Sequence, residues 1–188
     1  MSHNEDQTTN RFKLATLGGG CFWCMEAVFD QVRGVENVNS GYSGGSTANP
    51  KYGQVSTGAT GHAEVVQLIY DPTVISFRYI LKIFFIKHDP TTLNRQGADV
   101  GTQYRSIIFY HSKEQKAIAE QVIAEFNSEK IFGSTMVTKL EPFKAFYGAE
   151  DYHNAYFNRH PEQSYCQIVI SPKVAKLRKK FRDKLKKS

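Results

Sequence analysis

Residues 13–24 read Lys-Leu-Ala-Thr-Leu-Gly-Gly-Gly-Cys-Phe-Trp-Cys, and this stretch decides how the first part of the chain folds. Side chains alternate over 12–17 in the manner of a strand, and three glycines follow. Apolar residues then recur at helical spacing, which predicts a helix over 22–33 that Gly34 ends. We therefore expect a strand, a glycine turn and a helix, with Cys21 where the turn meets the helix.

The rest of the chain continues this mixture of elements. Further strands are predicted at 62–70, 106–111, 136–140 and 167–170, and further helices at 76–87, 112–126, 150–160 and from Ser171-Pro172 onward. The segments 39–61 and 89–105 are predicted as loops because Gly, Pro and polar residues dominate them. No linker or repeat divides the chain. We therefore expect one α+β domain with a mixed β-sheet packed with helices in a two-layer, sandwich-like core.

Composition excludes several classes of protein. The chain has 188 residues, of which 40% are hydrophobic and 22% are charged, as is ordinary for a soluble protein. No apolar run approaches the ~20 residues that span a bilayer, and residues 1–10 are polar without a secretory signal. Three cysteines are too few for a disulfide scaffold. We expect a cytoplasmic protein that has no membrane partner and a disordered segment at residues 1–10.

The net charge of +6 comes from one end of the chain. Residues 173–188 hold nine Lys or Arg and one acid, whereas the remaining 172 residues have a net charge of −2. Nucleic-acid binding through this tail is one alternative function. The near-neutral body and the lack of a nucleic-acid motif argue against it, so we expect no nucleic-acid partner and a packed basic helix.

Cys21 is a candidate nucleophile. A thiol attacks only as the thiolate, and the positive end of a helix stabilises that form; lowering the thiol pKa to ~7 takes about 2 kcal/mol. The sequence therefore predicts a lowered pKa at Cys21, with Phe22 and Trp23 forming an apolar pocket beside it. A small buried residue at a tight turn, next to ordinary core aromatics, is the alternative.

Cys21 and Cys24 have the C-x-x-C spacing of dithiol exchange proteins. General thiol–disulfide exchange is thus a second alternative function, although the order of elements is not that of a thioredoxin. Zinc is a poorer interpretation, because only Cys166 and scattered histidines could complete four ligands. We expect no metal and no cofactor.

Seven short motifs carry a resemblance to a known family. They are Gly20-Cys-Phe-Trp-Cys24, Gly41-Tyr-Ser-Gly-Gly45, Asn49-Pro-Lys-Tyr52, Thr60-Gly-His-Ala-Glu-Val-Val66, Tyr70-Asp-Pro72, Asp99-Val-Gly-Thr-Gln-Tyr-Arg-Ser106 and Glu150-Asp-Tyr-His153. In this order and spacing, over about residues 12–170, the chain resembles the A-type peptide methionine sulfoxide reductases. The resemblance makes 11–172 the catalytic domain and leaves 173–188 as a basic C-terminal helix.

The resemblance implies a role for each matching residue. Cys21 would attack the sulfoxide sulfur, Glu64 would donate a proton, and the phenols of Tyr52 and Tyr104 would hold the oxygen. The sequence supports Glu64, because it shares a strand face with apolar residues and burial raises a carboxyl pKa. Its alternative is an exposed carboxylate at the start of the strand.

The resemblance also implies the substrate and its surroundings. Phe22 and Trp23 would bind the methyl group, and Asp99 would support the site. The substrate would be the S epimer of methionine sulfoxide, in oxidised proteins or as the free amino acid. A thioredoxin-like reductant would recycle the enzyme, which we expect to be a monomer that repairs proteins under oxidative stress. Asp151 and His153 match the family without an assigned step.

Three thiols compete to resolve the sulfenic acid that the reaction would leave on Cys21. Cys166 lies near the position of the family's resolving cysteine, but its surroundings read as a strand rather than a flexible tail. Cys24 lies only three residues from Cys21, and an external thiol is the third possibility.

Overall fold

A computed structural model describes residues 11–187, so the predicted disordered segment 1–10 lies outside the described residues. A six-stranded sheet has the order β7-β6-β1-β3-β2-β8. Its strands are β1 (Lys13–Gly18), β2 (Val35–Ser43), β3 (Ala63–Tyr70), β6 (Ile107–Tyr110), β7 (Lys139–Pro142) and β8 (Tyr147–Gly148). All neighbours are antiparallel except β6 and β7, which confirms the mixed sheet. β4 (Arg95–Gln96) and β5 (Asp99–Val100) form a separate hairpin.

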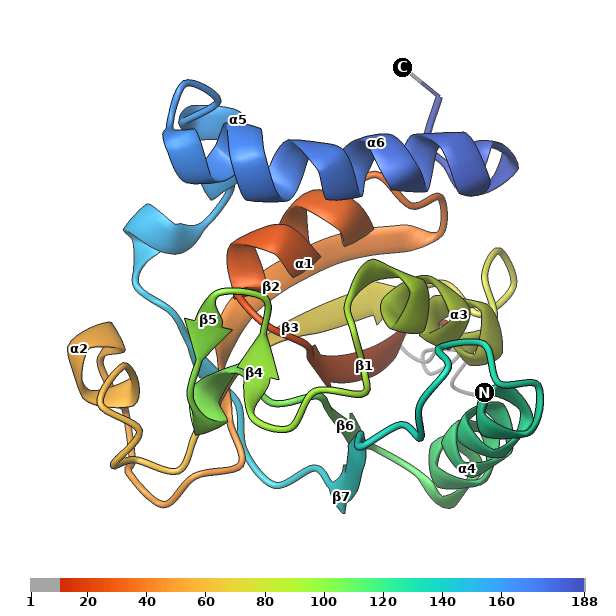
Figure 1. Cartoon of the computed structure of the whole chain (residues 1–188), viewed down its shortest axis with the longest axis horizontal. Coiled ribbons are helices and arrows are strands. Elements are labelled where there is room, and N and C mark those ends of the chain that lie inside the picture. The colour runs from red at the N-terminus through yellow and green to blue at the C-terminus, as the bar shows by residue number, and fades with distance from the viewer. Residues whose placement is uncertain (1–10, 188) are drawn as a thin grey trace, which may run out of the picture.

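The described part of the chain has six α-helices, and those that contact the sheet do so on one face. They are α1 (Phe22–Phe29), α2 (Tyr52–Val55), α3 (Phe77–Lys87), α4 (Lys113–Ser128), α5 (Tyr156–Arg159) and α6 (Ser171–Lys180). The helix α1 packs on β2 and β3, and α6 crosses over α1 on its outer side (Figure 1). The other side of the sheet carries a smaller apolar cluster, which Phe143 and Phe146 cover. None of the helices in the described part is long and apolar enough to cross a membrane.

The strands predicted at 12–17, 62–70 and 106–111 are confirmed, as are the helices at 76–87 and 112–126. Each of these two helices begins at a serine whose hydroxyl accepts a backbone N–H, Ser76 from Tyr79 and Ser112 from Gln115. A capping serine directly before a helical pattern is visible in the local sequence, which is why the starts of both helices could be predicted.

The loop predicted at 39–61 is wrong over its first part, because β2 runs to Ser43. This strand lies between β3 and β8, so its small and polar residues are buried by pairing rather than by hydrophobicity. The Ser40 hydroxyl donates to Glu26, and a Cβ at Gly41 would lie 2.4 Å from the Phe146 ring. The strand is stabilised by partners that are distant in sequence, so its own residues show no alternating hydrophobic pattern.

The strand predicted at 167–170 is also wrong. The chain is helical from 164 onward, and a wider π turn over Cys166–Ile170 leads directly into α6, so Ser171-Pro172 does not begin the helix. Buried residues recur every three or four positions, at Cys166, Ile170, Val174, Leu177 and Phe181. The π turn lies where Pro172, which has no N–H, interrupts the regular ladder.

Three other predicted boundaries shift. The helix predicted at 22–33 ends at Phe29, because 31–33 pair with the C-terminal segment, including a bridge from Val32 to Leu185. The strand predicted at 136–140 lies at Lys139–Pro142. The helix predicted at 150–160 is broken by Ala155, whose φ of 54° separates a 3₁₀ turn from α5.

Two substitutions test the helical state of 166–170. Ile168 and Ile170 would share one face of a strand, but in the structure Ile170 is fully buried and Ile168 is 73% exposed. We expect Ile170→Ala to lower the free energy of unfolding by about 2–5 kcal/mol. Ile168→Ala should change it by no more than ~0.5 kcal/mol. Urea unfolding measures both, and equal losses would contradict the helix.

Candidate active site

The glycine turn places Cys21 at the N-terminal end of α1. Gly20 has a φ of +90°, and a Cβ there would lie 2.6 Å from Gln96. The chain can therefore turn sharply from β1 into the helix only with glycine at this position. Cys21 is the N-cap residue and is almost completely buried.

A buried carboxyl lies directly beside this turn. Glu64, on β3, is only 2% exposed, and its Oε1 accepts the backbone N–H of Phe22 at 3.2 Å. Burial raises the pKa of Glu64 to about 8, even though this hydrogen bond favours the ionised form. The carboxyl is therefore mainly protonated at neutral pH. The sequence predicts that Glu64 shares a strand face with apolar residues, and this face of β3 is buried.

The two thiols of the site differ in acidity. Burial raises the pKa of Cys21 well above its usual value, and a hydrogen bond with Cys24 and the charge of Glu64 raise it further. The prediction that the helix start lowers this pKa is thus wrong for the resting site, because desolvation exceeds the effect of the helix. The same hydrogen bond, together with the charge of Lys173, lowers the pKa of Cys24 to about 6. Cys24 therefore ionises before Cys21.

Two predicted phenols lie close enough to Cys21 and Glu64 for the charges of these groups to act on them. Tyr52 belongs to α2 and Tyr104 ends a 3₁₀ turn, so two separate loops bring them in. Burial raises the pKa of both hydroxyls, and the charges of Glu64 and Cys21 raise it further. Both phenols therefore remain protonated and can donate hydrogen bonds.

Aromatic rings from the C-terminal part hold Trp23. Its indole N–H donates to Nδ1 of His153 at 3.1 Å, and its ring stacks on Tyr156 with centroids 3.7 Å apart. Phe22 lies 5.1 Å from the His153 ring and 5.8 Å from the Tyr42 ring, between centroids. The apolar wall predicted for Phe22 and Trp23 is therefore built together with residues more than 100 positions away.

Sequence reasoning missed most of this wall. His153 matched a family motif without receiving a role, and Tyr156 had no signal beyond being aromatic. Glu150 was also missed, although its carboxyl accepts from the Tyr42 hydroxyl and the Tyr52 N–H, both at 3.2 Å. Asp151, from the same motif, is exposed.

The remaining predicted residues lie on the other side of the thiols. Asp99 is on β5, and its Oδ2 accepts the Tyr165 hydroxyl at 2.9 Å. Cys166 is fully buried, and burial and the charge of Cys24 raise its pKa. The structure thus brings Cys24 next to Cys21 and leaves Cys166 behind Cys24, in the packing between α1 and the C-terminal helix.

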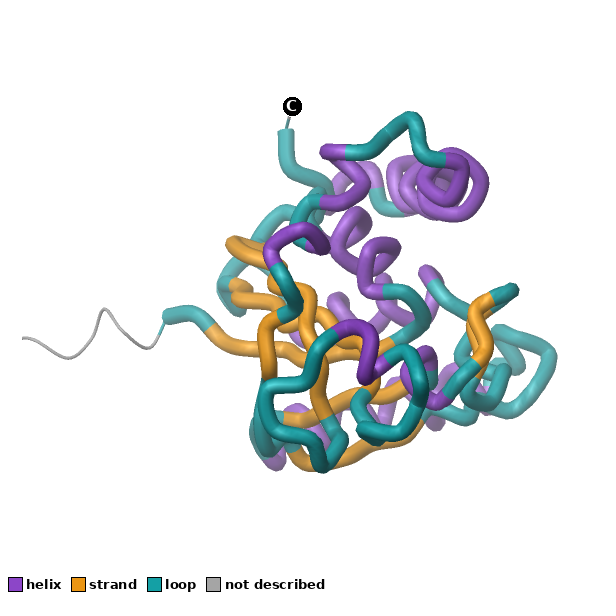
Figure 2. The backbone as a smooth tube through the Cα atoms, turned by 90° about the vertical axis from the view of Figure 1, so that its left-hand side faces the viewer, coloured by secondary structure: helices purple, strands orange, loops and turns teal. Residues whose placement is uncertain are grey.

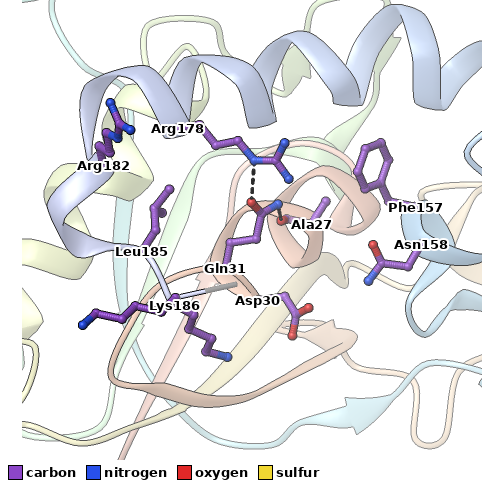
Figure 3. Close-up of a pocket in the computed structure, with 10 residues that line it drawn as sticks. Ala27, Asp30, Gln31, Phe157, Asn158, Arg178, Arg182, Leu185 and Lys186 are labelled. Carbon is purple, nitrogen blue, oxygen red and sulfur yellow. Dashed lines mark hydrogen bonds between the residues drawn. The ribbon is translucent and has the colours of Figure 1, made fainter.

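A large hollow in the surface lies away from these residues. It has a volume of about 700 Å³ and lies between the C-terminal half of α1, α5 and the C-terminal segment (Figure 3). Arg178, which lines it, donates to Gln31 at 3.0 Å. None of the predicted site residues lines this hollow. Within 11–187, no three His, Cys, Asp or Glu side chains gather as a metal site would require.

Two thiols within one turn of a helix start, beside a protonated carboxyl and two phenols, define a thiol-dependent oxidoreductase. A family model described as peptide methionine sulfoxide reductase matches residues 13–185. The peptide methionine sulfoxide reductase MsrA of Saccharolobus solfataricus is 59% identical over 174 residues, which cover 93% of this chain and 97% of that protein. The chain belongs to the peptide methionine sulfoxide reductase family.

Solved structures agree with this assignment. Mxr1 from Saccharomyces cerevisiae in reduced form has a TM-score of 0.76 and 36% identity, covering 88% of this chain and 95% of that chain. Mxr1 in complex with Trx2 has a TM-score of 0.54 and 28% identity, covering 83% of this chain and 92% of that chain. The predicted family, fold class and enzyme class are confirmed.

The raised pKa of Glu64 has a consequence for stability. Between pH 5 and pH 8 the folded state holds a proton on Glu64 that the unfolded chain has released, since its pKa of about 8 exceeds the usual 4.5. Stability therefore falls as the pH rises through this window. We expect the free energy of unfolding of the wild type to fall from pH 5 to pH 8 relative to that of Glu64→Gln.

Urea unfolding at several pH values measures this difference. Glu129→Gln, at an exposed carboxyl after α4, is the matched control: it keeps Glu64, so its free energy of unfolding should follow that of the wild type at every pH. A difference between wild type and Glu64→Gln that stays constant with pH would contradict the protonated carboxyl.

Proposed function

We propose that the protein reduces the S epimer of methionine sulfoxide to methionine, in oxidised proteins and as the free amino acid. One observation carries this proposal: the carboxyl of Glu64, buried and hydrogen-bonded to the Phe22 N–H, lies at the helix start that carries Cys21, and burial raises its pKa to about 8. A sulfoxide sulfur needs a nucleophile on one side and a proton for its oxygen on the other. Cys21 and Glu64 supply these two groups in one pocket.

In the first step the Cys21 sulfur attacks the sulfoxide sulfur. Its proton passes to Cys24, which is mainly ionised at neutral pH because its pKa is lowered to about 6. Glu64 protonates the sulfoxide oxygen, and the phenols of Tyr52 and Tyr104 stabilise the charge that develops there. The oxygen ends on Cys21 as a sulfenic acid, so the cysteine is oxidised by two electrons and the sulfoxide is reduced to methionine.

Specificity would come from the aromatic wall. Phe22 and Trp23 offer an apolar surface for the S-methyl group, and Trp23 is held by the hydrogen bond to His153 and the stack on Tyr156. Asp99, on the hairpin at the edge of the site, would support the bound substrate. Such a pocket recognises the methyl group beside the sulfoxide oxygen and requires little else of the substrate.

The place of Cys24 in the same turn as Cys21, with its N–H donating to the Cys21 carbonyl at 3.1 Å, and its lowered pKa support Cys24 as the thiol that resolves the sulfenic acid. Cys166 remains the family-based candidate, but it is fully buried in a helical turn that would have to open first. A thioredoxin-like reductant would then reduce the disulfide. The solved complex of Mxr1 with Trx2 supports this partner, and a thiol enzyme of this kind would act in the reducing cytoplasm.

Cys21→Ser tests the central assignment. A serine hydroxyl is a poor nucleophile near neutral pH and cannot form a sulfenic acid, so reduction of free and peptide methionine sulfoxide should be abolished. Consumption of NADPH with thioredoxin and thioredoxin reductase measures the activity, with and without a methyl sulfoxide. Turnover in Cys21→Ser would overturn the assignment, and wild-type turnover without a sulfoxide would instead indicate general dithiol exchange.

A pair of variants identifies the resolving cysteine. If Cys24 resolves, Cys24→Ser should form about one methionine per enzyme in a single turnover and then stall in thioredoxin-driven cycling. Cys166→Ser should continue to cycle. Mass mapping of the oxidised wild type should find a disulfide between Cys21 and Cys24. The opposite result in both variants would assign the role to Cys166.

A further inference from the structure

Tyr165 lies among the reacting groups and has no role in the steps above. Its hydroxyl donates to Asp99 Oδ2 at 2.9 Å and lies 3.7 Å from the Cys24 sulfur. Its ring meets Trp23 edge-on, with centroids 5.8 Å apart, so its position is fixed by packing. Burial and the nearby thiols raise the pKa of this phenol, and it therefore keeps its proton throughout.

A phenol has only one proton, so it cannot donate to Asp99 and Cys24 together. While the proton lies on the Asp99 side, the Tyr165 oxygen can only accept from the Cys24 thiol. Once Cys24 has ionised, the lone pairs of the Tyr165 oxygen and those of the Cys24 thiolate would face each other with no proton between them. Rotation of the O–H about its C–O bond removes the conflict by turning the proton toward the thiolate.

We propose that Tyr165 is a positioning residue that swings its hydroxyl proton from Asp99 to Cys24 and so prepares Cys24 to attack the oxidised Cys21. This inference rests on the proposed function, with Cys24 as the resolving thiol. In that step the Cys24 sulfur attacks the sulfur of the Cys21 sulfenic acid. The S–O bond breaks and the S–S bond forms. The proton that Cys24 gave up is held by the Glu64 carboxylate that the first step left, and it passes to the departing oxygen, which leaves as water. Tyr165 is unchanged at the end.

Other charged and titratable groups also face Cys24. Lys173 on α6 favours its thiolate, while Asp99 on β5 disfavours it. Lys87 on α3 also faces Cys24: burial lowers the pKa of this ammonium overall although the charge of Cys24 raises it, and the ammonium donates to the Lys173 carbonyl. Cys21 and Cys166 are the neighbouring thiols, and Glu64 lies on β3 beneath them. Among the described residues, Tyr165 contacts both Cys24 and a competing acceptor through the same atom.

Tyr165→Phe removes the hydroxyl and keeps the ring. In a single turnover with a peptide methionine sulfoxide and no reductant, we expect methionine to form at close to the wild-type rate. Disulfide formation should slow by about 10- to 100-fold, the effect of losing one hydrogen bond to a charged group. The sulfenic acid should accumulate and be trapped by dimedone. Rapid quenching, alkylation and mass spectrometry follow both steps.

Two further variants make the result specific. Tyr79→Phe removes a phenol hydroxyl from α3, next to Phe181 and away from the thiols, and should leave both steps unchanged. Asp99→Asn leaves Tyr165 with a weaker competing acceptor. Because Asp99 would also support the bound substrate, the disulfide step is timed from the sulfenic acid and not from mixing, and it should be as fast as in the wild type or faster. The Asp99→Asn variant keeps Tyr165 and therefore tests the proposal even if Tyr165→Phe does not fold.

Each contrary outcome has a distinct meaning. The inference is overturned if Tyr165→Phe slows both steps equally, if it forms the disulfide at the wild-type rate, or if Asp99→Asn slows this step as much as Tyr165→Phe. A disulfide from Cys21 to Cys166 would also overturn it. Failure of the wild type to form methionine would instead overturn the proposed function, so the two failures are distinguishable.

Discussion

The hydrogen bond from the Phe22 N–H to the buried Glu64 carboxyl is the contact on which the site depends. It joins the start of α1 to β3, the strand that β1 and β2 flank in the sheet. Burying a carboxyl is costly, and the group lowers this cost by keeping its proton and by accepting from a helix N-terminus. The same contact therefore holds the helix in place and creates an acid beside Cys21.

Desolvation controls the chemistry of this pocket more strongly than the helix start does. It raises the pKa of Glu64, Tyr52, Tyr104 and Cys21, so each of these groups retains its proton at rest. Cys24 is the exception, because the hydrogen bond from Cys21 compensates for burial. The resting site thus keeps protons on its carboxyl and its two phenols and has one thiol whose pKa is lowered.

The C-terminal part of the chain closes the site from the side opposite to the sheet. A second buried carboxyl on α1, that of Glu26, holds this part of the chain at Ala155. Glu26 accepts from the Ala155 N–H at 2.8 Å and from the Ser40 hydroxyl at 3.3 Å. These bonds pin the left-handed residue that breaks the helix predicted at 150–160. The chain then returns over α1 through α5 and α6, as the purple segments above the sheet show (Figure 2). Trp23 and the thiols are covered as a result.

Local patterns in the sequence determined the strand, glycine turn and helix around Cys21, the caps at Ser76 and Ser112, and the buried face that carries Glu64. Its motifs, through the resemblance, also indicated which side chains meet. The tertiary structure alone decided that 35–43 is a strand, that 164–180 is helical, and that the pKa of Cys21 is raised. It also decided the contacts of His153 and Tyr165 with the site. Periodicity and capping act over a few residues and leave a local signature, whereas desolvation and hydrogen bonds between distant segments depend on the whole fold and leave none.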